Sequence, residues 1–276
     1  MPAVAADPVR IACVGDSITE GSGLGNPAVE SYPARLQRLL GTHYLVRNFG
    51  VSGRTLLKKG DYPYWKESAY RLSRDFAPDI VLIKLGSNDA KSFNWRHGAE
   101  FEADYEELIA SYAVLSSAPR ILLATPAPVS RNGAFQINPG TVRTNIAPLI
   151  RRMAAHPGRE LVEFHDRLEG HPEWFPDTVH PNARGTAVMA AIAWQVVTGE
   201  TGPAVADPPS PTPLANGRLR IEWPAGFAGW VLVSTPALRE PATVWTVADG
   251  TFVNDGDRVR TTNSPGLQRF YRLWRP

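Results

Sequence analysis

Short apolar runs alternate with amphipathic stretches through residues 9 to 200, and this alternation constrains the fold more than any other feature of the sequence. Val, Ile and Leu dominate the runs, as expected for strands of a parallel sheet that is covered on both faces. The stretches between the runs carry apolar residues at the spacing of one helix face. The runs are residues 9–14, 44–48, 80–85, 120–124 and 160–164, and the amphipathic stretches are residues 31–41, 65–75, 101–115, 141–154 and 182–197. The pattern predicts an α/β fold with a doubly wound sheet.

The pattern changes near residue 200. Residues 203–213 hold five prolines, a density typical of a stiff, extended linker. The runs that follow alternate apolar and polar residues between Gly, Pro, Asn and Asp, which predicts short strands at residues 218–223, 229–234, 242–247, 258–261 and 269–274. We therefore expect three parts: an α/β domain over residues 8–201, a Pro-rich linker over residues 202–213 and a small all-β module over residues 214–276.

Charge and cysteine content exclude several classes of protein. The chain has 29 Lys and Arg against 27 Asp and Glu, a net charge of +2, which argues against a strongly basic nucleic-acid binder or a polybasic membrane binder. Cys13 is the one cysteine, so an internal disulfide and a cysteine-rich metal cluster are both excluded. No apolar run approaches the ~20 residues that a membrane helix needs. We expect a globular chain with no nucleic-acid partner and no membrane span.

The first residues bear on the compartment. Ala3-Val-Ala5 has the form of a signal-cleavage site, although neither a basic region nor an apolar region precedes it. One interpretation is an exported protein, periplasmic or secreted, whose signal peptide has been removed. The other is a cytoplasmic protein with a disordered Ala- and Pro-rich start.

Polar residues follow the predicted strands at the positions where an open α/β sheet binds ligands, beyond the carboxyl ends of its strands. Ser17 follows the first strand, Gly50 the second and Asn88 the third. Asp177 and His180 stand three residues apart, just before the last predicted helix. We expect the first three residues to converge at one edge of the sheet, with the Asp177–His180 loop beside them.

These residue types match the needs of nucleophilic hydrolysis. A serine nucleophile needs a base that accepts its proton and a group that orients the base. Ser17 can supply the hydroxyl, His180 the base and Asp177 the orienting carboxylate. The oxyanion of the tetrahedral intermediate needs hydrogen-bond donors, which the N–H groups of Ser17 and Gly50 and the side-chain amide of Asn88 can supply.

The same segments resemble the serine, glycine, asparagine and Asp-x-x-His blocks of the SGNH hydrolase superfamily, also called GDSL-type esterases and lipases. The resemblance covers roughly residues 8–200, with Ser87 where Thr is common in the family. It implies a flavodoxin-like α/β/α sandwich with a parallel five-stranded sheet, and ester hydrolysis through an acyl-enzyme on Ser17 without a metal or cofactor. Residues 174–185 are also similar to the carbohydrate- and sialate-acetylesterase branch. This similarity favours short acyl groups, acetyl first, on a small ester or an acetylated glycan.

Other roles for some of these residues stay open. Ser17 could cap the helix that follows the first strand, because serine is a favoured N-cap. His165 and Asp166 form a second candidate pair of base and orienting group, for which we expect a structural role. Residues 21–25 lack the third glycine of a dinucleotide-binding fingerprint, so we interpret them as a mobile loop at the active site. Cys13 lies in an apolar strand and is expected to be a buried, inert thiol.

The substrate is harder to predict. Two long connections, residues 91–97 and 126–140, mix aromatic and polar side chains, and we expect them to wall the pocket. A lysophospholipase or thioesterase is an alternative within enzymes.

The β module bears on a second alternative, a carbohydrate-binding protein with a secondary hydrolase domain. The module holds four of the eight tryptophans: Trp223, Trp230, Trp245 and Trp274. They could contact a polysaccharide, but a module of this size needs large aromatic residues to build a core, and we favour that role.

Overall fold

The computed structural model describes residues 7–130, 134–199, 210–214, 218–224, 231–235, 246–247, 252–254, 258–263 and 270–274. The chain divides into two compact units, Met1–Gly199 and Glu200–Pro276. No helix in the part of the chain described here is long and apolar enough to cross a membrane. The Ala3-Val-Ala5 segment lies outside the described residues.

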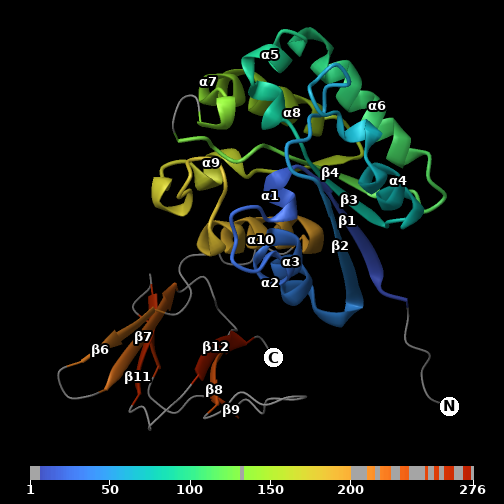
Figure 1. Ribbon diagram of the computed structural model, residues 1–276. Helices are drawn as coiled ribbons and strands as arrows, with labels where there is room; N and C mark the ends of the chain where they lie inside the picture. Colours follow the sequence, from blue (N-terminus) through green and yellow to red (C-terminus); the bar gives the residue numbers. More distant parts are fainter. Residues whose placement is uncertain are drawn as a thin grey trace, which may run out of the picture. The chain divides into compact units, whose positions relative to one another are not determined.

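A five-stranded sheet forms the centre of the first unit (Figure 1). Its strands are β1 (Val9–Gly15), β2 (Tyr44–Gly50), β3 (Ile80–Lys84), β4 (Arg120–Ala124) and β5 (Arg159–Val162). They lie in the order β2-β1-β3-β4-β5, and every neighbouring pair is parallel. This is the strand order of flavodoxin-like folds. The predicted doubly wound parallel sheet is therefore confirmed.

Helices cover both faces of this sheet (Figure 1). On one face lie α3 (Tyr32–Leu40) and α10 (Ala183–Thr198). On the other lie α4 (Ser68–Asp75), α6 (Phe101–Ala113) and α8 (Ala147–Ala154). Short helices join these elements: α1 (Ser17–Glu20), α2 (Pro27–Glu30), α5 (Ser92–Trp95), α7 (Pro139–Thr141) and α9 (His165–Leu168). Turns of 3₁₀ helix lie at Gly41–His43, Tyr64–Lys66, Asn88–Ala90, Gly98–Glu100, Ala134–Gln136 and Pro172–Trp174.

One predicted helix is interrupted. The amphipathic stretch at residues 141–154 continues from α7 into a π-helical segment, Val142–Ile146, before α8 begins. Pro148 lies in the first turn of α8 and has no N–H to donate. A regular α-helix running through this position would lose a hydrogen bond and meet the proline ring, and the wider π turn precedes the proline instead.

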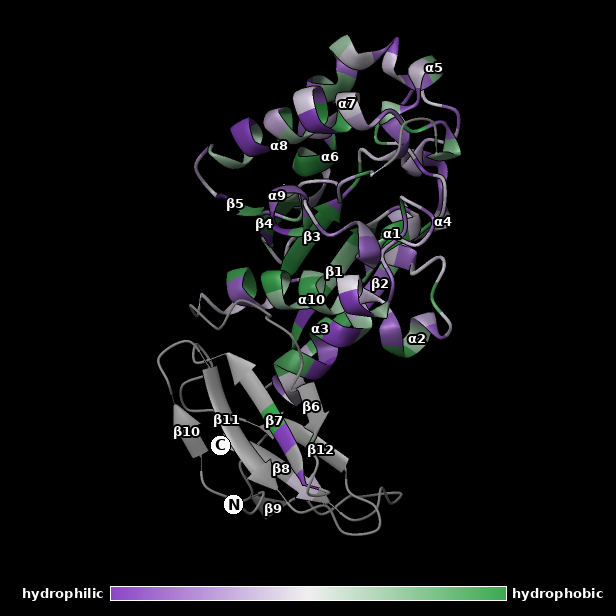
Figure 2. Ribbon diagram, turned by 90° about the vertical axis from the view of Figure 1, so that its left-hand side faces the viewer, coloured by the Kyte–Doolittle hydropathy of each residue, from purple (hydrophilic) through white to green (hydrophobic). Residues whose placement is uncertain are grey.

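The apolar core lies between the sheet and its helices. All five residues of β3 are buried, and the hydropathy colouring of Figure 2 shows β1 and β3 as largely hydrophobic. Phe101, Tyr105 and Tyr112 of α6 are fully buried against this face. Cys13 of β1 is buried as well, and burial raises the pKa of its thiol, as expected for an inert side chain.

Polar side chains gather at one point of this otherwise apolar layer. The strand order reverses between β1 and β3, and ligands of such sheets bind outside the carboxyl ends of the strands at that point. The residues just beyond these two strand ends are buried and polar: Asp16, Ser17, Ser87, Asn88 and Asp89. The fold thus places the predicted site where the topology favours one.

The second unit is described as seven strands in two antiparallel sheets. One sheet has the order β10-β11-β7-β6 and the other the order β12-β8-β9. The strands are β6 (Ser210–Pro213), β7 (Leu219–Pro224), β8 (Val231–Thr235), β9 (Thr246–Val247), β10 (Phe252–Asn254), β11 (Arg258–Asn263) and β12 (Phe270–Trp274). The predicted linker, residues 202–213, overlaps β6, so its last four residues are strand rather than linker. The side chains of Trp223, Trp230, Trp245 and Trp274 lie outside the described part of the chain.

Candidate active site

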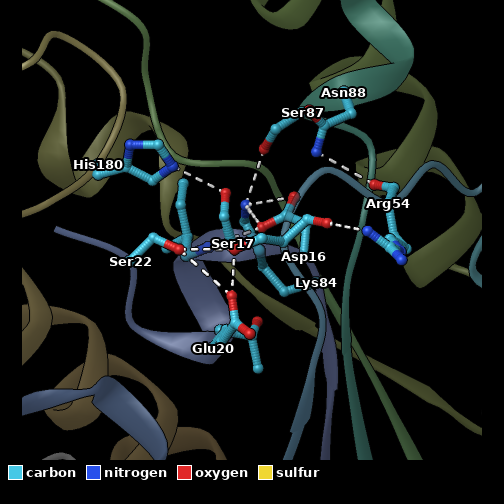
Figure 3. A network of polar contacts seen from close by, with 12 residues as sticks. Asp16, Ser17, Glu20, Ser22, Arg54, Lys84, Ser87, Asn88 and His180 are labelled. Atoms are coloured by element: carbon cyan, nitrogen blue, oxygen red, sulfur yellow. Dashed lines mark hydrogen bonds and ion pairs between the residues drawn. The ribbon is translucent and has the colours of Figure 1, made fainter. Parts of the chain in front are cut away.

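Ser17 begins α1, directly after β1. The residue that caps this helix is Asp16, whose carboxylate accepts a hydrogen bond from the Ile18 N–H at 3.0 Å. A capping role for Ser17 is therefore wrong, and its hydroxyl is available for another contact. The Ser17 Oγ lies 2.8 Å from the Nε2 of His180, as Figure 3 shows.

The loop before α10 orients His180. The Nδ1 of its ring is 2.7 Å from one carboxylate oxygen of Asp177. The other oxygen of Asp177 accepts hydrogen bonds from the backbone N–H groups of Val179 and His180. With the Nδ1 proton donated to the carboxylate, the lone pair of Nε2 points toward Ser17. The structure thus brings the three predicted triad residues together in the expected order.

The same contacts lower the pKa of Asp177. Burial acts to raise the pKa of this carboxyl, but the hydrogen bonds from the His180 and Val179 backbone and from the His180 ring outweigh it. The pKa of Asp177 is therefore lower than that of an ordinary aspartate. Thr178 has a left-handed backbone with φ of 74°, which is uncommon for a residue other than glycine. This turn allows the N–H groups of Val179 and His180 to reach back to the Asp177 carboxylate.

Gly50 does not occupy the position predicted for it. Its N–H donates to the side-chain oxygen of Asn48 at 2.9 Å, and it ends β2 without lining the cavity beside Ser17. A Cβ at Gly50 would overlap the backbone nitrogen of Glu20. Glycine is needed here for the close approach of β2 and α1, and its assignment as an oxyanion donor does not fit the geometry.

Gly53 lies three residues further on and does line the cavity, together with Ser17 and Asn88. Within the described residues, the N–H groups of Ser17 and Gly53 have no hydrogen-bond acceptor. The Nδ2 of Asn88 donates one hydrogen bond to the Arg54 carbonyl at 3.2 Å, which leaves its second N–H for a ligand. Three donors therefore border the same space as the Ser17 hydroxyl.

An ion pair that the sequence analysis missed lies beneath Ser17. The Lys84 Nζ is 2.9 Å from both carboxylate oxygens of Asp16 and 2.7 Å from the Oγ of Ser87 (Figure 3). The side chains of Lys84 and Asp16 are both fully buried. Burial lowers the pKa of Lys84, and the charge and hydrogen bonds of Asp16 act in the opposite direction. The pair ties β3 to the residue that precedes Ser17.

The cavity beside Ser17 and His180 has a volume of about 690 Å³. Both connections that were expected to wall the pocket contribute to it, Lys91 and Phe93 from one and Phe135, Gln136 and Ile137 from the other. Ser22 of the glycine-rich segment, Ser52 and Asp61 complete the polar part of the lining. The cavity is therefore lined by apolar, charged and hydroxyl-bearing side chains together.

His165 and Asp166 are the rival pair. Their side chains are in contact at 2.9 Å, but Asp166 is also held by Arg151, and His165 borders a separate cavity of about 250 Å³. Together with Glu169 they offer three possible metal-ligand atoms within 4.8 Å of one another. This is the one such group among the described residues. The two carboxylates are exposed, and one is already paired with arginine. We assign no metal to them and interpret the pair as structural.

Known proteins are similar to this chain in sequence and in fold. Residues 13–188 match the GDSL-like lipase/acylhydrolase family. The chain is 39% identical over 210 residues to an acetylxylan esterase of Xylanibacter ruminicola, an alignment that covers 70% of this chain and 44% of that protein. The chain thus spans less than half the length of this relative.

Solved structures share the fold. A carbohydrate acetylesterase of Sinorhizobium meliloti is 22% identical, with a TM-score of 0.57, and the alignment covers 69% of this chain and 99% of that one. An aryl esterase of M. smegmatis is 19% identical, with a TM-score of 0.57, and the alignment covers 69% of this chain and 98% of that one. At these identities the likeness establishes the fold.

Proposed function

The chain belongs to the GDSL-like lipase/acylhydrolase family, and from this membership and the geometry of its site we propose that it is a serine esterase that hydrolyses short acyl esters, acetyl esters first. The observation that carries the proposal is the 2.8 Å contact between the Ser17 Oγ and the His180 Nε2, with Asp177 on the far side of the ring. A hydroxyl in contact with an oriented neutral imidazole is the arrangement that acyl transfer to serine requires.

Acylation follows from the positions of these atoms. The Nε2 of His180 takes the Ser17 proton as the Ser17 Oγ attacks the ester carbonyl, and Asp177 stabilises the imidazolium that forms. The carbonyl oxygen becomes an oxyanion, for which we propose the N–H groups of Ser17 and Gly53 and the side-chain amide of Asn88 as donors. The intermediate then expels the alcohol, which takes the proton from His180.

Deacylation repeats the sequence with water. The imidazole of His180 is neutral again and removes a proton from a water molecule, which attacks the acyl carbonyl of Ser17. The same three donors stabilise the second oxyanion. Ser17 leaves with the proton held by His180, and the carboxylic acid is released. The triad and the oxyanion donors account for every proton and charge in this route.

The proposed acyl group is acetyl, and the proposed alcohol is a carbohydrate. The relative named acetylxylan esterase supports both parts for this chain. The test is a series of p-nitrophenyl esters from acetyl to octanoyl, with Ser17→Ala as the inactive reference. We expect kcat/KM to fall steeply as the chain lengthens. A rising trend would overturn the short-acyl proposal and favour a lysophospholipase or thioesterase.

We also propose that residues 8–201 form the catalytic domain and residues 214–276 a separate β module. The division of the chain into two compact units and the antiparallel strands of the second unit support this organisation. Contact of the module with polysaccharide rests on its four tryptophans alone. Retention of the full chain on insoluble xylan, and its loss in Trp230→Ala, would support that contact; equal retention of both chains, or none, would count against it.

A further inference from the structure

The catalytic cavity contains an ion pair that the proposed reaction does not use. Asp61 and Lys91 both line the cavity, and the Lys91 Nζ lies 3.3 Å from one carboxylate oxygen of Asp61. Their side chains are 23% and 14% exposed, respectively, although Asp61 as a whole residue is exposed. A charge pair that is partly withdrawn from water loses hydration, which further hydrogen bonds can replace.

Asp61 is fixed in place from behind by Asn94, which is itself buried. The Nδ2 of Asn94 donates to the second carboxylate oxygen of Asp61 and to the backbone oxygen of Asn88, each at 2.9 Å. The Oδ1 of Asn94 accepts the Asp61 N–H at 2.9 Å. One side chain thus sets the position of Asp61 relative to Asn88, a proposed oxyanion donor.

The pair retains donors and an acceptor for a ligand. An ammonium group has three N–H donors, and Lys91 directs one of them to Asp61. The carboxylate oxygen that faces Lys91 accepts that hydrogen bond alone among the described residues, and each carboxylate oxygen has two lone pairs. Two donors and one acceptor are therefore fixed side by side in the cavity wall.

Aromatic rings complete this part of the cavity. Phe93 and Phe135 both line it, and their exposed fractions of 40% and 56% are high for phenylalanine. Phe135 and Gln136 have left-handed backbones, with φ of 51° and 63°, and an isolated bridge pairs Ile137 with Lys91. The Phe135 ring lies edge-on to the His180 ring, with centroids 5.1 Å apart. Strained backbone thus holds an exposed ring next to the proposed base.

We propose that Asp61 and Lys91 form a subsite that binds two neighbouring free hydroxyls of a carbohydrate ester, with Phe93 and Phe135 as apolar surfaces for the sugar ring. This inference rests on the proposed esterase function and specifies the alcohol part of its substrate. One sugar hydroxyl donates to Asp61, and its neighbour accepts from Lys91.

The charges favour this ligand over others. An alkyl chain would displace the water molecules that hydrogen-bond to the ion pair and would offer no hydrogen bonds in their place, which is unfavourable. Anionic and cationic groups would each meet a like charge in the pair. A neutral polyol satisfies both partners and also presents C–H groups to the aromatic rings, so it fits every part of the lining.

The test compares two acetyl esters that differ in their hydroxyl groups. One is a monoacetylated methyl xyloside with free neighbouring hydroxyls, and the other is cyclohexyl acetate. The quantity measured is the kcat/KM of the xyloside ester divided by the kcat/KM of cyclohexyl acetate. We expect Asp61→Asn and Lys91→Met each to lower this ratio about tenfold, the effect of one hydrogen bond to a charged group. Any disturbance that passes through Asn94 to Asn88 would slow both esters and leave the ratio unchanged.

Glu100→Gln is the matched control. Glu100 pairs with Lys59 at 2.7 Å on the surface, and neither residue lines the cavity. Its ratio should equal that of the wild type. An unchanged ratio in both Asp61→Asn and Lys91→Met would overturn the subsite while leaving the esterase function intact. A wild-type chain that hydrolyses neither ester would overturn the esterase function and, with it, this inference.

Discussion

The Lys84 Nζ lies 2.9 Å from both carboxylate oxygens of Asp16, with both side chains fully buried and Ser17 next in the chain. Asp16 in turn caps α1, the helix that Ser17 begins. A buried charge without its partner is strongly unfavourable, so this pair fixes the strand end and the helix start as one unit. The position of the proposed nucleophile therefore depends on a residue of a different strand.

Replacing Lys84 should destabilise the fold. In Lys84→Met, the Asp16 carboxylate stays buried without its partner, and we expect the free energy of unfolding to fall by about 3–5 kcal/mol. Urea unfolding followed by circular dichroism measures this change. Arg71→Met is the control, because Arg71 pairs with Asp75 on the surface, and such pairs contribute about 0.3–0.5 kcal/mol. Equal losses in the two variants would contradict a structural role for the buried pair.

Asn88→Ala tests the oxyanion donors. Loss of one such donor typically lowers kcat by about 10²–10³, because the charge of the intermediate loses a preorganised hydrogen bond. We expect a decrease of this size with p-nitrophenyl acetate and little change in melting temperature. Asn145→Ala removes an exposed asparagine that does not line the cavity, and its kcat should match the wild type. A kcat in Asn88→Ala within a few-fold of the wild type would exclude the donor role.

Two glycines should respond differently to alanine. At Gly50 a Cβ would overlap backbone atoms of α1, so Gly50→Ala should lower the melting temperature and the yield of folded protein. At Gly53 a Cβ meets no atom within 4 Å, but the backbone has φ of +80°. Gly53→Ala should therefore turn its N–H away from the cavity, at a cost of about 1–2 kcal/mol, and mainly lower kcat. The reverse pattern would return the oxyanion role to Gly50.

The sheet could be predicted from sequence because each strand is short, apolar and covered on both faces. The observed boundaries of all five strands lie within two residues of the expected ones. The approach of Asp177 and His180 to Ser17 could also be predicted, because Ser17 follows the first strand and the other two residues stand just before the last helix. The interruption of the helix at residues 141–154 depends on Pro148 and its neighbours, and the apolar periodicity alone did not indicate it.

The rest of the site depends on contacts between distant residues. Gly50 and Gly53 both follow the strand predicted at residues 44–48, and only the folded structure distinguishes them. The Asn48 side chain accepts a hydrogen bond from the Gly50 N–H, whereas Gly53 lines the cavity. Lys84 sits in an apolar strand, and its partner Asp16 is 68 residues away. Asp61 and Lys91 come from separate connections that meet only in the folded chain. No local pattern predicts such pairs.

Asp89 should make stability depend on pH. Burial raises the pKa of this carboxyl to about 7, although it accepts hydrogen bonds from the Leu56 and Leu57 N–H groups. An unfolded aspartate ionises near pH ~3.9, so between about pH 4 and pH 7 the folded chain binds more protons than the unfolded chain. The free energy of unfolding should therefore fall as the pH rises through this window, by a contribution on the order of 4 kcal/mol, and level off above it.

Asp89→Asn isolates this contribution. Urea unfolding of the wild type and of this variant, measured at intervals from pH 4 to pH 8, gives the difference between their unfolding free energies. The free energy of unfolding of the wild type minus that of the variant should fall as the pH rises from about 4 to about 7 and should change little at higher pH. A difference that is the same at every pH would show that Asp89 does not titrate in this range.

Ser17 is the proposed nucleophile of the esterase reaction. The most direct measurement is intact and peptide mass after treatment with diethyl p-nitrophenyl phosphate, which phosphorylates activated serines. We expect one adduct per chain on the peptide that contains Ser17, formed in proportion to the loss of esterase activity, and no adduct in Ser17→Ala. Complete inactivation with the adduct on another residue, or undiminished activity in a folded Ser17→Ala chain, would contradict the mechanism.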